Sequence, residues 1–212
     1  MAGEEKRDFD SKAARWDEEP RRVKLAGEVV EALKGALPLA PTMEALDYGC
    51  GSGLVTLGLQ PLVARITGAD SSKGMLEVLG GKVAERGIDN VATQFVDLEE
   101  DQRLAGSFDL IVSSMTMHHV ADVPALVAAF VESLRPGGWL ALADLEREDG
   151  SFHEDPTGVR HHGFDRDYFP GLYSRNGLSE IRVVTASTIE KKSPAGETRA
   201  YPVVLAVARK PL

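Results

Sequence analysis

The chain has 212 residues, the size of one large domain. It carries 33 acidic and 24 basic side chains, a formal net charge of -9, and 43% hydrophobic residues, which excludes disorder and collagen-like repetition. The acidic balance argues against a general affinity for nucleic acids or anionic membranes, because phosphate binding needs clustered Lys and Arg.

The N-terminal region and the single cysteine favour a reducing compartment. Residues 1–22 are too charged for a secretory signal, and no apolar run approaches the roughly 18 residues of a membrane span. Cys50 has no partner for an internal disulfide. We therefore expect a cytoplasmic protein, monomer or homodimer, without nucleic-acid or membrane partners.

The N-terminal segment predicts a helical cap. Residues 21–37 show an amphipathic helical pattern, and Phe9 and Trp16 stand in the charged stretch before it. These aromatic residues either pack on the domain or belong to a lid over a ligand. We expect a helical lid over residues 1–40 and the main domain over 41–212.

From residue 43 onward, short apolar runs alternate with amphipathic stretches. Buried strands are predicted at 43–48, 65–69, 91–96, 108–113 and 139–144. Helices are predicted at 73–86 and 124–134. Strands that alternate with helices indicate βαβ units, hence a parallel sheet covered on both faces.

The C-terminal part follows a different pattern. Two strands are predicted at 181–190 and 201–209, and the ten-residue joint between them is too short for a crossover helix. We expect this pair to be antiparallel. Residues 145–165 form the longest irregular stretch, and a loop of this length is usually functional or disordered.

A glycine loop is the sharpest local signal. In the run ALDYGCGSG (45–53) a strand ends, glycines turn the chain and a helix opens. Glycine lets a ligand approach the backbone, and the helix start offers free N–H groups. Asp70 ends the next strand, where such folds bind a ribose diol. The glycines could also merely turn the chain.

The details of this loop disfavour a phosphate ligand. The spacing is Gly-x-Gly-x-Gly, an acid (Asp47) precedes it, and no GK[ST] of a phosphate-binding loop is present. A carboxylate there would repel a pyrophosphate and favour a cation. A ligand with a ribose and a positive group fits better.

Five motifs in order then resemble a known family. They are DYGCGSG, GADSSKGML, FVDLEE, FDLIVSSMTMHHV and LRPGGWLALAD, spread over about 45–145. Together they resemble class I S-adenosylmethionine-dependent methyltransferases, most of all the small-molecule branch similar to the ubiquinone/menaquinone-biosynthesis enzymes. The resemblance implies an α/β, Rossmann-like, doubly wound sheet of seven mostly parallel strands with an antiparallel last strand. It also implies methyl transfer from S-adenosyl-L-methionine to a small molecule, releasing S-adenosyl-L-homocysteine.

The same resemblance implies a set of cofactor-binding residues. They are Asp47, Gly49, Gly51 and Gly53 at the methionine end, Asp70 at the ribose, Ser71, Met75, Asp97 and Leu98 at the adenine, Ser113 and Ser114 beside the methionyl part, and Trp16 in the lid.

The five histidines are the candidates for acid–base chemistry. A base is needed only if the acceptor must lose a proton, because the cofactor supplies the reactivity. The candidate catalytic residues are His118, His119 and His162, and the candidate substrate contacts are Asp144, His153 and His161. Packing or capping remains an alternative for these histidines. No compact ligand spacing is present, so no metal site is predicted.

Other interpretations stay open. The run EREDGSFHEDP (146–156) is either a solvated loop or an acidic pocket mouth, which would suit a neutral or cationic acceptor. We expect Cys50 to fill the turn rather than to act as a nucleophile. Two rival functions are a nicotinamide-dependent oxidoreductase and a non-catalytic cofactor-binding subunit. A macromolecular substrate is less favoured, although protein methylation stays open.

Overall fold

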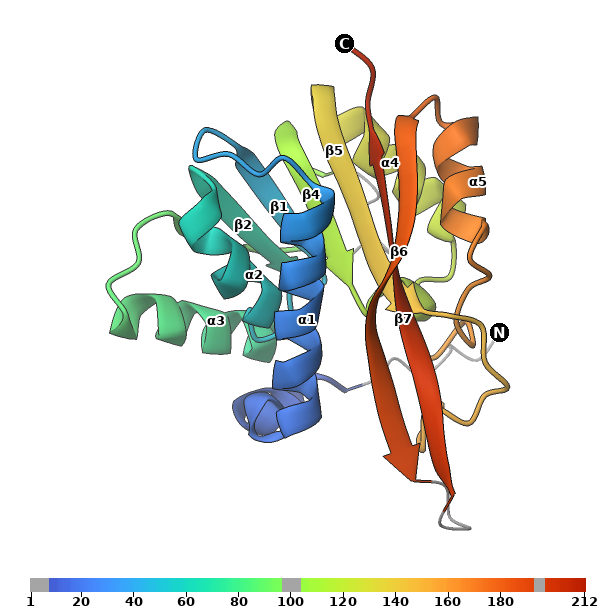
Figure 1. The fold of residues 1–212 in the computed structure, drawn as a ribbon. Coiled ribbons are helices and arrows are strands. Elements are labelled where there is room, and N and C mark those ends of the chain that lie inside the picture. The colour runs from blue at the N-terminus through green and yellow to red at the C-terminus, as the bar shows by residue number, and fades with distance from the viewer. Residues whose placement is uncertain (1–7, 97–103, 193–196) are drawn as a thin grey trace, which may run out of the picture.

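The computed structural model describes residues 8–96, 104–192 and 197–212. These residues form one sheet of seven strands in the order β3-β2-β1-β4-β5-β7-β6 (Figure 1). The strands are β1 Glu44–Tyr48, β2 Arg65–Asp70, β3 Val91–Phe95, β4 Phe108–Ser114, β5 Leu134–Leu145, β6 Ser179–Lys192 and β7 Thr198–Arg209.

The strand directions confirm the predicted topology. Strands β1 to β5 pair in parallel, and β7 runs antiparallel to both of its neighbours. The chain enters the sheet at β1, in the middle, and adds β2 and β3 on one side of it. It then crosses back and adds β4 on the other side of β1. The sheet is therefore doubly wound, with its switch point between β1 and β4.

Helices cover both faces of the sheet. Figure 1 shows α1 and α2 on one face and α4 and α5 on the other. The helical elements are η1 Asp10–Glu18, α1 Pro20–Ala36, α2 Leu54–Leu59, η2 Gln60–Leu62, α3 Lys73–Glu85, η3 Met117–His119, α4 Val123–Ser133 and α5 Tyr168–Arg175. None of the described helices is both long and apolar enough to cross a membrane.

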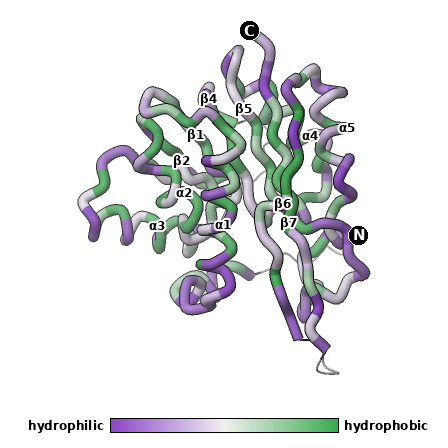
Figure 2. Tube along the Cα trace, in the orientation of Figure 1, coloured by the Kyte–Doolittle hydropathy of each residue, from purple (hydrophilic) through white to green (hydrophobic). Residues whose placement is uncertain are grey.

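The core has two halves because side chains alternate along each strand. In β4, Leu110 and Val112 belong to the cluster that α1 and α2 cover, whereas Ile111 belongs to the cluster under α4 and α5. Figure 2 shows the same arrangement as hydrophobic strands in the interior. Helix α1 contributes Val29 and Leu33 to the first cluster, so it is part of the core, while the domain boundary near residue 40 stays a prediction.

The sequence patterns located most elements, and two of the differences are informative. Helix α4 begins where predicted, because the Asp122 side chain accepts a hydrogen bond from Ala125 N at 2.9 Å. Strand β5 starts earlier than predicted, with Leu134 paired to Phe108 before the register shifts. Helix α5 was not predicted; it is held by tertiary packing, since the Tyr173 hydroxyl donates to Ala206 O at 3.1 Å.

Candidate functional site

A deep cavity opens at the carboxyl ends of β1, β2 and β4. This is the switch point of the sheet, where open α/β folds bind ligands. The cavity measures about 1140 Å³. It exceeds the roughly 300–1,000 Å³ of ordinary ligand pockets, so it has room for a nucleoside-sized ligand and a second molecule.

The glycine turn after β1 shapes the floor of this cavity. A Cβ at Gly49 would lie 2.3 Å from Thr116 Oγ1, and one at Gly53 would lie 2.3 Å from a Leu79 methyl carbon. At Gly51, with φ of +52°, the nearest atom would be Met75 Sδ at 4.0 Å. Two glycines are therefore needed for close packing, and Gly51 leaves space that a ligand can fill.

Asp70 ties the end of β2 to this turn. Its two carboxylate oxygens accept hydrogen bonds from Gly51 N at 2.7 Å and Ser72 N at 2.8 Å. Burial nevertheless raises the pKa of Asp70, because desolvation outweighs these bonds. A carboxylate oxygen has more than one lone pair, so Asp70 can accept further hydrogen bonds from a ligand in the cavity.

Asp47 is a second carboxyl beneath the turn. It is 1% exposed, and Oδ2 accepts a hydrogen bond from Thr56 Oγ1 at 2.6 Å. Desolvation, reinforced by the charge of Asp70, raises the pKa of Asp47 to about 7. A cationic ligand nearby would stabilise both carboxylates.

Cys50 lies inside the turn and is also buried. Desolvation, with the charges of Asp47 and Asp70, raises the pKa of the Cys50 thiol well above its ordinary value. A thiol that stays protonated is a poor nucleophile. This supports the interpretation of Cys50 as a small side chain that fills the turn.

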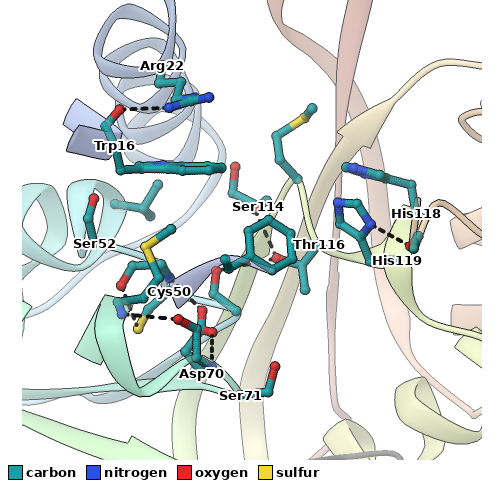
Figure 3. A pocket seen from close by; sticks show the side chains of 18 of the residues that line it. Trp16, Arg22, Cys50, Ser52, Asp70, Ser71, Ser114, Thr116, His118 and His119 are labelled. Carbon is teal, nitrogen blue, oxygen red and sulfur yellow. Dashed lines mark hydrogen bonds between the residues drawn. The ribbon is translucent and has the colours of Figure 1, made fainter. Parts of the chain in front are cut away.

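The N-terminal segment covers the cavity. The Asp10 carboxylate accepts hydrogen bonds from Ser72 Oγ and from Gly74 N at 2.9 Å, which fastens η1 to the start of α3. Asp17 accepts a hydrogen bond from Ser52 Oγ. In Figure 3 the indole of Trp16 lies over the pocket, and the Arg22 guanidinium stacks 3.8 Å from its ring centre.

Phe9 connects this cover to a group of histidines. Its ring centre lies 5.9 Å from that of Trp16 and 5.4 Å from that of His119. The ring centre of His118 lies 4.1 Å from that of His119 and 5.0 Å from that of His153. Three histidines from two segments of the chain thus gather at the far side of the cavity.

His118 is held by a buried carboxylate. Its Nδ1 donates to Asp144 Oδ1 at 2.7 Å, and the two side chains are 2% and 0% exposed. Asp144 also accepts hydrogen bonds from the backbone N–H groups of His118 and Leu145, at 3.2 and 2.7 Å. With the proton fixed on Nδ1, the other ring nitrogen of a neutral His118 carries the lone pair that a base needs.

The structure brings together most of the residues singled out from sequence. Those that line the cavity are Trp16, Asp47, Gly49, Gly51, Asp70, Ser71, Met75, Ser114, His118, His119 and His153. Asp97 and Leu98 lie outside the described residues. The roles assigned to all of these residues stay predictions.

Five of the expected residues do not line the cavity: Gly53, Ser113, Asp144, His161 and His162. Gly53 packs against Leu79, Ser113 donates to Tyr48 O at 2.7 Å, and Asp144 stands behind His118. The ring of His161 donates from Nε2 to Val120 O at 3.0 Å.

His162 points outward. Its side chain is 53% exposed, and Nδ1 lies 3.6 Å from Glu148 Oε1. The loop residue next to this pair, Arg160, lines the cavity instead. Neither His161 nor His162 lines the cavity in this structure: the His161 ring is hydrogen-bonded to Val120 O, and the His162 ring is exposed beside Glu148.

The acidic run 146–156 forms ion pairs with arginines of other segments. Glu146 pairs with Arg166 at 3.0 Å, and Asp149 pairs with Arg199 at 2.8 Å. Within 146–156, the residues that line the cavity are Phe152 and His153. No carboxylate of this run lines the cavity, which favours the interpretation as a solvated loop.

Sequence reasoning missed several residues of the lining. They are Asp10, Thr116, Arg160 and Lys191. Thr116 follows Met115, whose φ of +56° turns the chain after β4 toward the glycine loop. Lys191 was detectable in principle, because it lies two residues from Ile189 on a strand whose side chains alternate. Among the described residues, no three His, Cys, Asp or Glu side chains are arranged to hold a metal ion.

Comparisons with known proteins agree with this geometry. Residues 18–188 match the methyltransferase domain family. Over 192 residues, 82% of the chain, the sequence is 34% identical to trans-aconitate 2-methyltransferase of Deinococcus radiodurans and covers 67% of that protein. Over 110 residues, 51% of the chain, it is 32% identical to ubiquinone biosynthesis O-methyltransferase of Marinobacter nauticus and covers 46% of that protein.

A solved structure shows the same fold at lower identity. Phosphoethanolamine N-methyltransferase 2 of Haemonchus contortus, determined with S-adenosyl-L-methionine, aligns with a TM-score of 0.69 and 18% identity, over 87% of this chain and 52% of that one. The chain spans 38% to 67% of the lengths of the curated relatives that it matches. With its family match over most of its length and its seven-stranded Rossmann-like sheet, the chain belongs to the methyltransferase domain family.

Proposed function

We propose that this protein transfers a methyl group from S-adenosyl-L-methionine to a small-molecule acceptor. One observation carries the proposal: Asp70 is fixed by Gly51 N and Ser72 N at the edge of a cavity large enough for two ligands. The names of the curated relatives, which include trans-aconitate and ubiquinone-biosynthesis methyltransferases, support a small acceptor.

The residues present fit such a cofactor. Asp70 offers carboxylate oxygens to a ribose diol, and the space above Gly51 admits a ligand close to the backbone. The carboxylates of Asp47 and Asp70 favour a cation and disfavour a pyrophosphate. Met75 and Trp16 supply apolar surface at the same end of the cavity. When bound, the cofactor would supply an electrophilic methyl group.

The chain's own residues would then bind, shield and deprotonate the acceptor. Phe9 and Trp16, whose rings pack together and line the cavity, would shield the reactants from water. His118, oriented by Asp144, would accept a proton at Nε2 from a hydroxyl or similar acceptor group. Alignment of the reactants can contribute roughly 7–11 kcal/mol, so the base is a secondary effect.

The binding experiment separates this proposal from its rivals. Isothermal titration calorimetry should show binding of S-adenosyl-L-homocysteine and none of NADH. Asp70→Asn should weaken binding by about 1–3 kcal/mol, because charge-assisted hydrogen bonds are lost. The matched control is Asp89→Asn, since Asp89 is exposed and away from the cavity. Binding of NADH alone would refute the proposal.

A further inference from the structure

The segment η1, which carries Trp16 over the pocket, has little apolar anchoring of its own. Within Asp10–Glu18, Ala13 is the one residue that is buried. The element has 3₁₀ geometry, whose hydrogen bonds are poorer than those of an α-helix, and 3₁₀ runs longer than three or four residues are uncommon. A segment with few buried apolar contacts opens easily. The polar contacts that seat η1 therefore decide how firmly it covers a ligand.

Lys82 of α3 joins η1 to the glycine turn. Its Nζ donates one hydrogen bond to Ser52 O at 2.7 Å and another to the Asp17 carboxylate. Ser52 Oγ donates to Asp17 Oδ1 at 2.5 Å, so these three residues all bond to one another. We call this group of Asp17, Ser52 and Lys82 the Lys82 bridge. It links η1, the turn after β1 and the last part of α3.

Helical spacing explains why Lys82 reaches the glycine turn. Met75, Leu79 and Lys82 stand at positions i, i+4 and i+7 of α3, so they share one face of the helix. A Cβ at Gly51 would have Met75 Sδ as its nearest atom, at 4.0 Å. One at Gly53 would lie 2.3 Å from a Leu79 methyl carbon. Lys82 continues this stripe with a polar contact, where η1 meets α3.

The ion pair of the bridge is better shielded from solvent than a pair inside η1 itself. The side chains of Lys82 and Asp17 are 18% and 32% exposed, against 83% and 61% for Arg15 and Glu18. Exposed ion pairs contribute little, because water and salt screen them. The Lys82–Asp17 pair is therefore the one that can hold η1 in place.

The bridge acts on the cavity from outside it. Ser52 lines the cavity within the glycine turn, whereas Asp17 and Lys82 are not among the lining residues. Trp16 precedes Asp17 in the chain and lies at the same end of the pocket as Ser52 (Figure 3). A contact that holds Asp17 therefore also holds the indole over a ligand that occupies the glycine turn.

We propose that the Lys82 bridge positions η1 and Trp16 over bound S-adenosyl-L-methionine or S-adenosyl-L-homocysteine and thereby slows their release. The proposal deepens the proposed function and rests on it. Lys82 and Asp17 touch neither reactant, so both are positioning residues. Without the bridge, η1 stays fastened at its other end, where Asp10 accepts hydrogen bonds from Ser72 and Gly74.

The test measures how fast the full chain releases S-adenosyl-L-homocysteine. Binding is followed in a stopped-flow instrument by tryptophan fluorescence, because Trp16 lines the cavity and the second tryptophan, Trp139, does not. The rate constants for association and dissociation are obtained from the dependence on ligand concentration.

The variants are Lys82→Gln, Asp17→Asn and the two combined. Asp17→Asn removes the charge but keeps an oxygen that can accept the hydrogen bond from Ser52 Oγ. The controls break exposed ion pairs elsewhere: Glu18→Gln, within η1, loses the pair with Arg15, and Lys34→Gln, on α1, loses the pair with Glu31.

Lys82→Gln and Asp17→Asn should each raise the dissociation rate constant about 5-fold to 50-fold, with the association rate constant changed less than about threefold, since a charge-assisted hydrogen bond is lost. The combined variant should be no more than about twofold faster than the faster single variant, because both substitutions break the same bridge. The controls should stay within about twofold of wild type.

Tryptic cleavage after Arg15 follows η1 without any ligand. Cleavage there requires η1 to leave its seat, so its rate reports local opening and not global unfolding. Lys82→Gln and Asp17→Asn should be cut about 5-fold or more faster than wild type and Lys34→Gln, with the cut identified by mass spectrometry.

Four results would overturn the proposal. They are dissociation rate constants equal to those of the controls, an effect of Lys82→Gln without one of Asp17→Asn, unchanged cleavage after Arg15, and a Trp16 fluorescence that does not respond to bound ligand. Failure of the proposed function has a different signature, because calorimetry would then show no binding of S-adenosyl-L-homocysteine at all. The cleavage rates still test the bridge in that case.

Discussion

Replacing Asp47 by asparagine tests the electrostatics under the glycine turn. The Asp47 side chain is 1% exposed, and its pKa is raised from 3.8 to about 7, chiefly by desolvation. Asparagine keeps an oxygen that can accept the hydrogen bond from Thr56 Oγ1, but it cannot ionise. The variant therefore removes the buried charge and preserves the contact.

The sign and size of the effect follow from linkage. Because the folded-state pKa is the higher one, the contribution of Asp47 to stability is fully present below pH 3.8 and is lost as the pH rises through about 7. At about 1.4 kcal/mol per pKa unit, a shift of about three units corresponds to ~4 kcal/mol above pH 7. Between pH 5 and pH 8, wild type should lose about 2–3 kcal/mol that Asp47→Asn does not lose.

The assay is urea unfolding of the ligand-free protein between pH 5 and pH 8. The slope against pH carries the test, because the buried amide NH₂ adds a pH-independent cost of about 1–3 kcal/mol. Asp89→Asn, at an exposed position, should keep the wild-type slope. Parallel pH profiles for wild type and Asp47→Asn would refute the reasoning.

Three further outcomes are expected. Asp144→Asn should lower the methylation rate constant about 10²-fold to 10⁴-fold for an acceptor that must lose a proton, because the variant weakens the orientation of His118. The affinity for S-adenosyl-L-homocysteine should stay unchanged. An equal loss of rate and affinity would indicate a structural role. Gly51→Ala and Gly87→Ala should each lower the free energy of urea unfolding by about 1–2 kcal/mol, since both glycines have a positive φ. In calorimetry, only Gly51→Ala should weaken the binding of S-adenosyl-L-homocysteine. Cys50 should react with a thiol reagent at pH 7 only after unfolding, and rapid labelling of the folded protein would contradict its burial.

Local signals made much of the fold predictable from sequence. The five parallel strands are short apolar runs between breakers, and a joint too short for a helix predicted the antiparallel pair β6 and β7. Helix α5 escaped because Pro170 and Gly171 interrupt it; the spacing of Phe169, Leu172 and Tyr173, which are buried, was its available signal.

The site was predictable where residues follow a strand directly. Asp70 ends β2 and His118 follows β4, so the order of strands along the chain placed both at the carboxyl end of the sheet, where the cavity lies. Asp10 had no such signal, because its bond to Ser72 joins segments 62 residues apart. Arg160 lines the cavity while the neighbouring His161 and His162 do not, and the turn of the loop decides this. Loop conformation depends on tertiary contacts that the sequence pattern does not carry.

Transfer of a labelled methyl group tests the central claim most directly. The protein is incubated with S-adenosyl-L-methionine carrying a tritiated methyl group and a low-molecular-mass cell extract, and the label is followed into small molecules other than the cofactor. Wild type should transfer label, and Asp70→Asn at the same cofactor concentration should transfer much less, because its cofactor site is weakened. Label that stays in the cofactor, or label recovered in macromolecules alone when they are supplied, would contradict a small-molecule methyltransferase.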